Sequence, residues 1–167
     1  MSLRRYVAVA VAALALTAPA QASASVTKQI FTENSTGVSP MDAGDGLAGC
    51  VGYSGLVYEA RHGVWKLTIG KRDGHVEGVV DATFRIFPKP GQSGVVYRGS
   101  YVEHSVGRFV PGRDGDMPHP MAMYQLRGRG VGSDGSILRF HEIGQTQIDL
   151  RTGSLKRDRF SLGCTVA

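Results

Sequence analysis

The sequence has few features of membrane or fibrous proteins. Its longest apolar run, residues 7–16, has ten residues, whereas a helix that spans a bilayer needs roughly 20. The 23 glycines do not recur at every third position, which excludes a collagen-like chain. Hydrophobic residues make up 42% of the 167 residues and charged residues 20%. This composition is typical of one folded globular domain rather than a disordered chain.

Motifs for metal, nucleotide or nucleophilic chemistry are also missing. The five histidines occur singly, without the H-x-H or H-x-x-x-H spacing of a metal site. No G-x-S-x-G elbow is present. Residues 130–135 match G-x-G-x-x-G, but a strand-like segment follows them where the dinucleotide-binding motif needs a helix. We therefore expect neither a metal nor an organic cofactor.

The N-terminal residues 1–24 are typical of a secretory signal peptide. Arg4 and Arg5 precede the apolar run, and Ala-Ser-Ala at 22–24 gives a cleavage pattern before Ser25. Cleavage leaves 167 − 24 = 143 residues with 19 − 2 = 17 basic and 14 acidic side chains, a formal net charge of +3. We expect a secreted protein that does not insert into a membrane after cleavage. So small and scattered a charge does not favour nucleic acid as a partner.

The two cysteines, Cys50 and Cys164, both lie in the expected mature chain. In an oxidising compartment a minimal even number of cysteines favours one disulfide. The bond would close a loop of 164 − 50 = 114 residues, and the chain-entropy relation gives a stabilisation of about 4 to 5 kcal/mol.

Extended segments alternate with turn signals along the rest of the chain. The turn-forming residues predict a flexible loop at residues 34–49, a tight turn at His62-Gly63 and a hairpin turn at residues 132–135 (GSDG). No segment shows the 3.6-residue apolar period of a helix. The expected strands are eight: 25–33, 55–61, 64–70, 75–87, 95–106, 121–131, 136–150 and 154–164.

Sequential antiparallel strands of this length predict an eight-stranded up-and-down β-barrel, which leaves no exposed sheet edge. A two-sheet β-sandwich is the alternative. We expect a single domain, in which residues 25–49 form an N-terminal strand and a flexible loop and residues 50–167 form the core. A barrel of eight strands is either filled by its side chains or holds one small ligand.

The alternation along the strands indicates which side chains face inward. Residue 142 is the exception in an apolar series, because Glu142 lies between Phe140 and Gly144 on the inner face of its strand. Burial disfavours the charged form of a carboxyl group unless it is paired. Glu142 is therefore the candidate acid, base or ligand-orienting group, unless an Arg or Tyr simply pairs with it. Tyr124 and Trp65 face the same interior.

The strand at 95–106 has no cleanly apolar face. Either Glu103 points inward together with Tyr97 and Tyr101, or His104 points inward together with neighbouring valines. Both alternatives add a titratable group to the interior, and a few convergent polar groups in an apolar space are typical of a small-molecule pocket.

The segment V-G-S-D-G-S-I-L-R-F-H-E (Val131 to Glu142), together with Cys50 and a final strand ending in Cys164, resembles a group of small secreted bacterial β-barrel proteins. In outline this group is similar to the calycin and allene oxide cyclase-like superfamily. The resemblance implies an apolar cavity of the kind used by cofactor-free cyclases and dirigent-type proteins. No catalytic motif of those proteins maps onto residues of this chain.

Three functions follow as hypotheses. The first is binding of a small, mostly apolar ligand in the interior, near Glu142, Tyr124, Trp65, Tyr97, Tyr101 and Phe140. The second is a cofactor-free cyclase or isomerase in which Glu142 acts as acid or base. The third is an extracellular interaction or inhibitor module that contacts a protein partner through the long loop at 107–120.

Overall fold

The computed structural model describes residues 26–70, 73–109, 121–149 and 154–167. The predicted signal peptide and most of the loop at 107–120 lie outside these residues. The described elements are β1 (Thr27–Met41), α2 (Gly46–Val51), β2 (Gly55–Ile69), β3 (Gly74–Pro88), β4 (Tyr97–Phe109), β5 (Met121–Gly132), β6 (Ile137–Asp149) and β7 (Ser154–Val166).

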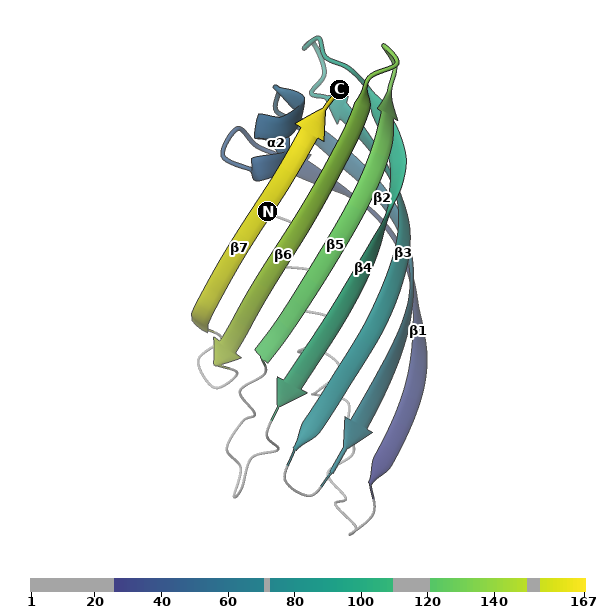
Figure 1. The fold of residues 1–167 in the computed structure, drawn as a ribbon, viewed down its shortest axis with the longest axis vertical. Coiled ribbons are helices and arrows are strands. Elements are labelled where there is room, and N and C mark those ends of the chain that lie inside the picture. The colour runs from purple at the N-terminus through teal and green to yellow at the C-terminus, as the bar shows by residue number, and fades with distance from the viewer. Residues whose placement is uncertain (1–25, 71–72, 110–120, 150–153) are drawn as a thin grey trace.

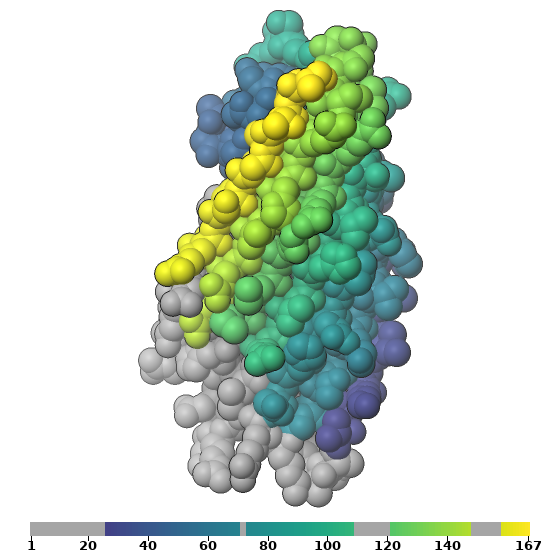
Figure 2. All heavy atoms as spheres, in the orientation of Figure 1, coloured from purple at the N-terminus to yellow at the C-terminus, as the bar shows by residue number. Residues whose placement is uncertain are grey.

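The strands form one antiparallel sheet in the order β1-β2-β3-β4-β5-β6-β7, so each strand pairs with its neighbours in the sequence. The up-and-down, all-β prediction is therefore confirmed, and the sheet is single rather than the two-layer sandwich. The sheet is strongly curved, and α2 lies beside β7 at one end (Figure 1). Figure 2 shows β7, β6, β5 and β4 side by side on the outer surface, with α2 next to the upper part of β7.

Two parts of the barrel prediction are not met. The described residues contain seven strands rather than eight, and no hydrogen-bonded ladder among them joins β1 to β7. The sheet is therefore an open one with a concave inner face. Among the described residues there is also no helix of the length and apolarity that crossing a membrane requires.

The strand count differs because His62 and Gly63 do not form a turn. Both lie inside β2 and pair with Asp81 and Val80 of β3. Gly63 faces the concave side, where a Cβ would stand 2.9 Å from Trp65 Nε1 and 3.1 Å from a methyl group of Val80. This glycine thus allows close side-chain packing within a continuous strand.

The first strand is longer than expected for the same reason. Because β2 is one long strand, its first half needs a partner, and residues 34–41 provide it, with Asn34 opposite His62 and Met41 opposite Gly55. The predicted flexible loop at 34–49 is therefore wrong for its first half. Its second half contains the first part of α2, which the sequence did not indicate because six residues are too few to show a helical period.

The alternation of buried and exposed residues matches the predicted inner face on β3, β5 and β6. Apolar side chains on this concave face form two clusters. The larger cluster lies near α2 and contains Met41, Val57, Ala82, Phe84, Ile86, Tyr97, Tyr101, Leu126 and Leu138, with Ala48 of α2. The smaller cluster contains Trp65, Leu67, Val76, Val80 and Ala122.

Several aromatic rings occupy space that glycines leave open on the next strand. Tyr124 of β5 lies over Gly144 of β6, and Phe140 of β6 lies over Gly128 of β5, so that a Cβ on either glycine would overlap the ring. Pairing a large ring with a glycine across two strands keeps the curved inner face filled. Much of the high glycine content therefore reflects packing on this face.

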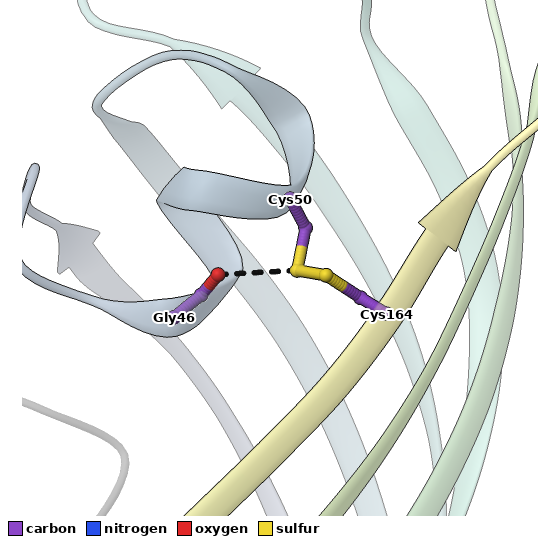
Figure 3. The surroundings of a disulfide bond; sticks show 3 residues. All are labelled: Gly46, Cys50 and Cys164. Carbon is purple, nitrogen blue, oxygen red and sulfur yellow. Dashed lines mark hydrogen bonds between the residues drawn. A yellow bond between two sulfur atoms is a disulfide. The ribbon is translucent and has the colours of Figure 1, made fainter.

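The predicted hairpin turn and disulfide are both confirmed. Gly135, with a φ of 86°, occupies the left-handed position of the turn between β5 and β6. Cys50 of α2 is bonded to Cys164 of β7, with a Cα–Cα distance of 5.9 Å. Figure 3 shows this bond beside Gly46, whose carbonyl oxygen lies 3.1 Å from Cys50 Sγ. The disulfide thus fastens α2 to the last strand.

Candidate ligand cavity on the concave face

A group of polar side chains crosses the concave face between the two apolar clusters. Its centre is Arg61 of β2, whose Nη1 donates to Tyr101 Oη at 2.8 Å and whose Nη2 donates to Glu103 Oε2 at 3.0 Å. Both acceptors belong to β4, and the guanidinium reaches them across β3. Ala82, the β3 residue paired with both Arg61 and Tyr101, is small enough to allow this.

Glu103 is the most deeply buried member of this group, at 0% exposure. Its second oxygen accepts a hydrogen bond from Ser105 Oγ at 2.7 Å. The first of the two alternatives for this strand is thus correct, since Glu103, Tyr97 and Tyr101 point inward while His104 is exposed. Arg61 compensates the Glu103 charge, as burial of a carboxylate requires.

Glu33 of β1 extends the same group toward the smaller cluster. Its Oε1 lies 3.5 Å from Arg61 Nε, and its Oε2 accepts a hydrogen bond from Trp65 Nε1 at 3.1 Å. Trp65 itself is buried in the smaller apolar cluster, at the end of the concave face away from α2.

Glu142, the acidic residue singled out on the predicted inner face, is buried on β6. Tyr124 Oη donates to Glu142 Oε1 at 2.5 Å. The two side chains meet because Tyr124 pairs with Gly144 of β6, two residues from Glu142 on the same face, and its ring lies over that glycine. The pairing with a tyrosine that the sequence analysis gave as the structural alternative for Glu142 is thus present, and the same hydrogen bond positions the carboxylate.

A cavity of about 80 Å³ lies between this polar group and α2. One water needs roughly 10–15 Å³ of such space, so the cavity has room for a small organic group. It is bounded by parts of every strand and by the start of α2, and its lining includes Ser39, Met41, Leu47, Phe84, Tyr101, Leu126, Phe140, Glu142, Phe160 and Leu162, with Glu59.

Two polar residues of the lining have few protein partners among the described residues. Ser39 of β1 is 8% exposed and its hydroxyl makes no hydrogen bond there. Glu59 of β2 is 9% exposed and lies near Tyr101 and Arg61. Both residues belong to the lining and add polar groups to a mostly apolar wall.

The surroundings change the acidity of these groups. Burial raises the pKa of Glu59, and the negative charge of Glu103 acts in the same direction, against the opposing effects of Tyr101 and Arg61. Burial also raises the pKa of Tyr101, and the nearby Glu59 carboxylate adds to that effect. Tyr101 is therefore a neutral hydrogen-bond donor across the physiological pH range.

The structure brings together three of the six predicted ligand-binding residues at the cavity wall: Tyr101, Phe140 and Glu142. Tyr124 contacts the cavity through Glu142. Trp65 lies in the other apolar cluster, and Tyr97 is buried with its Oη 3.2 Å from Ser136 Oγ. Neither of these two residues belongs to the cavity lining.

Three polar residues on the concave face, Ser39, Glu59 and Arg61, were not among the site residues predicted from the sequence. The sequence did contain information on Arg61 and Glu59. On a continuous strand every second residue faces the same side, so the inward positions of Trp65 and Leu67 imply that residues 63, 61 and 59 also face inward. The assumed turn at His62-Gly63 interrupted that count. Ser39 was hidden by the interpretation of residues 34–49 as a loop.

No group of three or more His, Cys, Asp or Glu side chains in the described part of the chain is arranged to hold a metal ion. Comparison with protein-family models, with curated proteins and with solved structures found no match to this chain. Any functional conclusion therefore depends on the cavity itself.

Proposed function

We propose that the protein is a secreted binding protein for a small, mostly apolar molecule held in the cavity beneath α2. The supporting observation is that a mostly apolar lining also contains two buried polar residues, Ser39 and Glu59. Small-molecule sites typically have this composition, a mostly apolar lining with a few placed polar groups.

The position of the cavity also suits binding. The helix α2 covers it with Leu47, and the disulfide to β7 keeps that cover in place. A site whose walls are fixed before binding loses less conformational freedom when the ligand enters. The disulfide is compatible with the extracellular location that the N-terminal signal predicts.

Native mass spectrometry of the protein purified from the culture medium of its own host tests this proposal. We expect a bound small molecule in the wild type and its loss in Ser39→Phe, which fills the cavity. Thr36→Phe is the matched control, because Thr36 is exposed on the outer side of the same strand. Wild-type protein recovered from the medium without a small molecule would contradict the binding function, and absence of the protein from the medium would contradict its secretion.

A cofactor-free cyclase or isomerase is the second candidate. It is favoured by the 2.5 Å hydrogen bond between Tyr124 and Glu142 beside a cavity that Glu59 also lines, since an acid–base reaction needs titratable groups that converge on one space. An isomerase would change the NMR spectrum of the released ligand without changing its mass. Binding without conversion would leave both unchanged.

A further inference from the structure

Five arginines gather on the convex, outer face of the sheet, in the half that lies toward α2. They are Arg85 of β3, Arg98 of β4, Arg127 and Arg129 of β5 and Arg139 of β6, and all five are exposed. The strand register places them in three adjacent rows that cross the sheet, and β4 to β6 lie side by side on the surface seen in Figure 2. We call these five residues the arginine patch, because the fold brings them together from separate parts of the sequence.

The register also places like charges directly opposite each other. Arg85 of β3 is the partner of Arg98 of β4, and Arg129 of β5 is the partner of Arg139 of β6. Like charges at opposite positions of neighbouring strands lower the stability of a sheet. Two such pairs side by side are therefore not explained by the fold, and they are typical of a surface that meets a negatively charged partner.

The chain itself offers these arginines little negative charge. The three rows extend from that of Asp81 to that of Arg85 on β3, and Asp81 is the one acidic side chain among their described residues. Asp81 lies opposite Val102, and Asp134 in the turn between β5 and β6 accepts hydrogen bonds from Ser136. In the part of the chain that the structure describes, no ion pair involves any arginine of the patch.

A shallow hollow of about 520 Å³ on the outer face joins this patch to aromatic surface. Its lining includes Arg85 and Arg98 together with Tyr58, Thr83 and Phe87. Tyr58 is 40% exposed, and the guanidinium carbon of Arg85 lies 5.7 Å from the centroid of the Phe87 ring. The hollow thus presents two cations and two aromatic side chains to the same open space.

We infer that the arginine patch binds an acidic polysaccharide. Each guanidinium offers paired N–H donors to the acidic groups of such a polymer, and the rings of Tyr58 and Phe87 offer an apolar surface to its sugar rings. Neighbouring strands lie about 4.8 Å apart, so one arginine on each of β3, β4, β5 and β6 gives a track of about 14 Å for a linear chain of charges. This site is on the convex face, so the inference does not depend on the proposed cavity.

Two other polyanions fit the patch less well. Proteins that bind single-stranded nucleic acid combine basic residues with aromatic side chains along the strand, but the three rows contain one Phe, Tyr or Trp among their described residues, Tyr58. A flat lipid bilayer meets only part of a strongly curved convex sheet (Figure 1), whereas a flexible polymer can follow the curve across all four strands.

Titration calorimetry of the purified protein at low ionic strength tests the inference, with heparin as the acidic polysaccharide and dextran as the neutral one. We expect heparin to bind and dextran not to bind, and we expect added salt to weaken heparin binding because exposed charges are screened. Oligothymidylate and phosphatidylglycerol vesicles are compared with heparin at equal concentrations of charged groups. Absence of heparin binding, or tighter binding of either comparison probe, would overturn the assignment to a polysaccharide.

The triple variant Arg98→Gln/Arg129→Gln/Arg139→Gln locates the site. It should weaken heparin binding about tenfold, as the loss of three exposed charge contacts implies. The matched control is Lys28→Gln/Arg108→Gln/Arg159→Gln, which removes the same charge from exposed positions outside the three rows. The control should bind heparin nearly as tightly as the wild type.

Equal weakening in the two triple variants would show that heparin responds to the net charge of the protein and not to the patch, and it would overturn the inference. Circular dichroism checks that both variants are folded. If the patch variant is not folded, the comparison of heparin with the three other probes on the wild type still decides the question. Each of these results leaves the proposed cavity untouched, because that site is on the concave face.

Discussion

Arg61 Nη2 lies 3.0 Å from Glu103 Oε2, although strand β3 separates the strands of these two residues. The side chain of Glu103 is 1% exposed and that of Arg61 13%, so the pair is shielded from solvent. Breaking a buried ion pair by removing one partner leaves an uncompensated charge. The polar group on the concave face therefore depends on Arg61.

Arg61→Ala should lower the free energy of unfolding by about 3–5 kcal/mol, because it leaves Glu103 without its cation. Urea denaturation measures the change. Arg129→Ala, at an exposed position of β5, is the control and should change stability by about 0.5 kcal/mol or less. The double variant Arg61→Leu/Glu103→Leu should recover most of the lost stability, because it removes both buried charges. A double variant as unstable as Arg61→Ala would contradict this explanation.

Gly144→Ala should destabilise the protein by about 1–3 kcal/mol, because a Cβ at this position overlaps the Tyr124 ring. The displaced ring would also move the hydroxyl that donates to Glu142. Thermal unfolding followed by circular dichroism gives the effect. Gly163→Ala on β7, where a Cβ meets nothing within 4 Å, is the matched substitution. Equal melting temperatures for the two variants would show that the ring is not held against Gly144.

The stability of the protein should depend on the Glu59 carboxyl in a defined pH direction. Its pKa in the folded state is raised above the ordinary value of 4.5, chiefly by burial. Its stabilising contribution is therefore complete below the unfolded-state pKa and is lost as pH rises through the folded-state pKa. Glu59→Gln should match the wild type near pH 4 and become relatively more stable toward pH 7. Urea titrations of both proteins over this range test the sign, and a gap that narrows with rising pH would refute it.

Reducing the disulfide should cost about 4–5 kcal/mol of unfolding free energy if closure of the loop between Cys50 and Cys164 governs its effect. Because α2 covers the cavity, the reduced protein should also bind a small, mostly apolar probe such as benzyl alcohol more weakly. Denaturation and NMR titration with and without a phosphine reductant measure the two effects. Unchanged stability after complete reduction, verified by thiol titration, would exclude a structural role for the bond.

The sequence predicted the inner face best where strands alternate without interruption. On β6 the series through Leu138, Phe140 and Gly144 is apolar, so Glu142 stood out, and the structure buries it beside Tyr124. The disulfide was also predictable, because two cysteines in a chain with a predicted signal peptide have one possible pairing. These conclusions needed only the two-residue period of a strand and the chemistry of the expected compartment.

The remaining features depend on contacts between distant segments. Gly63 resembles a turn residue in the sequence, and its packing against Trp65 and Val80 is visible only when β2 and β3 are paired. The helix α2 has too few residues to show a period, and it is held by packing of Leu47 and by its disulfide. The assumed turn at His62-Gly63 divided β2 into two strands, and the resulting eight strands predicted a closed barrel.

The location of a bound probe tests the central claim most directly. In an NMR experiment on the protein with benzyl alcohol, intermolecular nuclear Overhauser effects should connect the ring protons to the methyl groups of Met41 and Leu126, which line the cavity. No such effects should reach Val79 and Val102, which are exposed on the outer face. Contacts to the outer valines alone, or none to the two cavity residues at saturating probe, would contradict a binding site beneath α2.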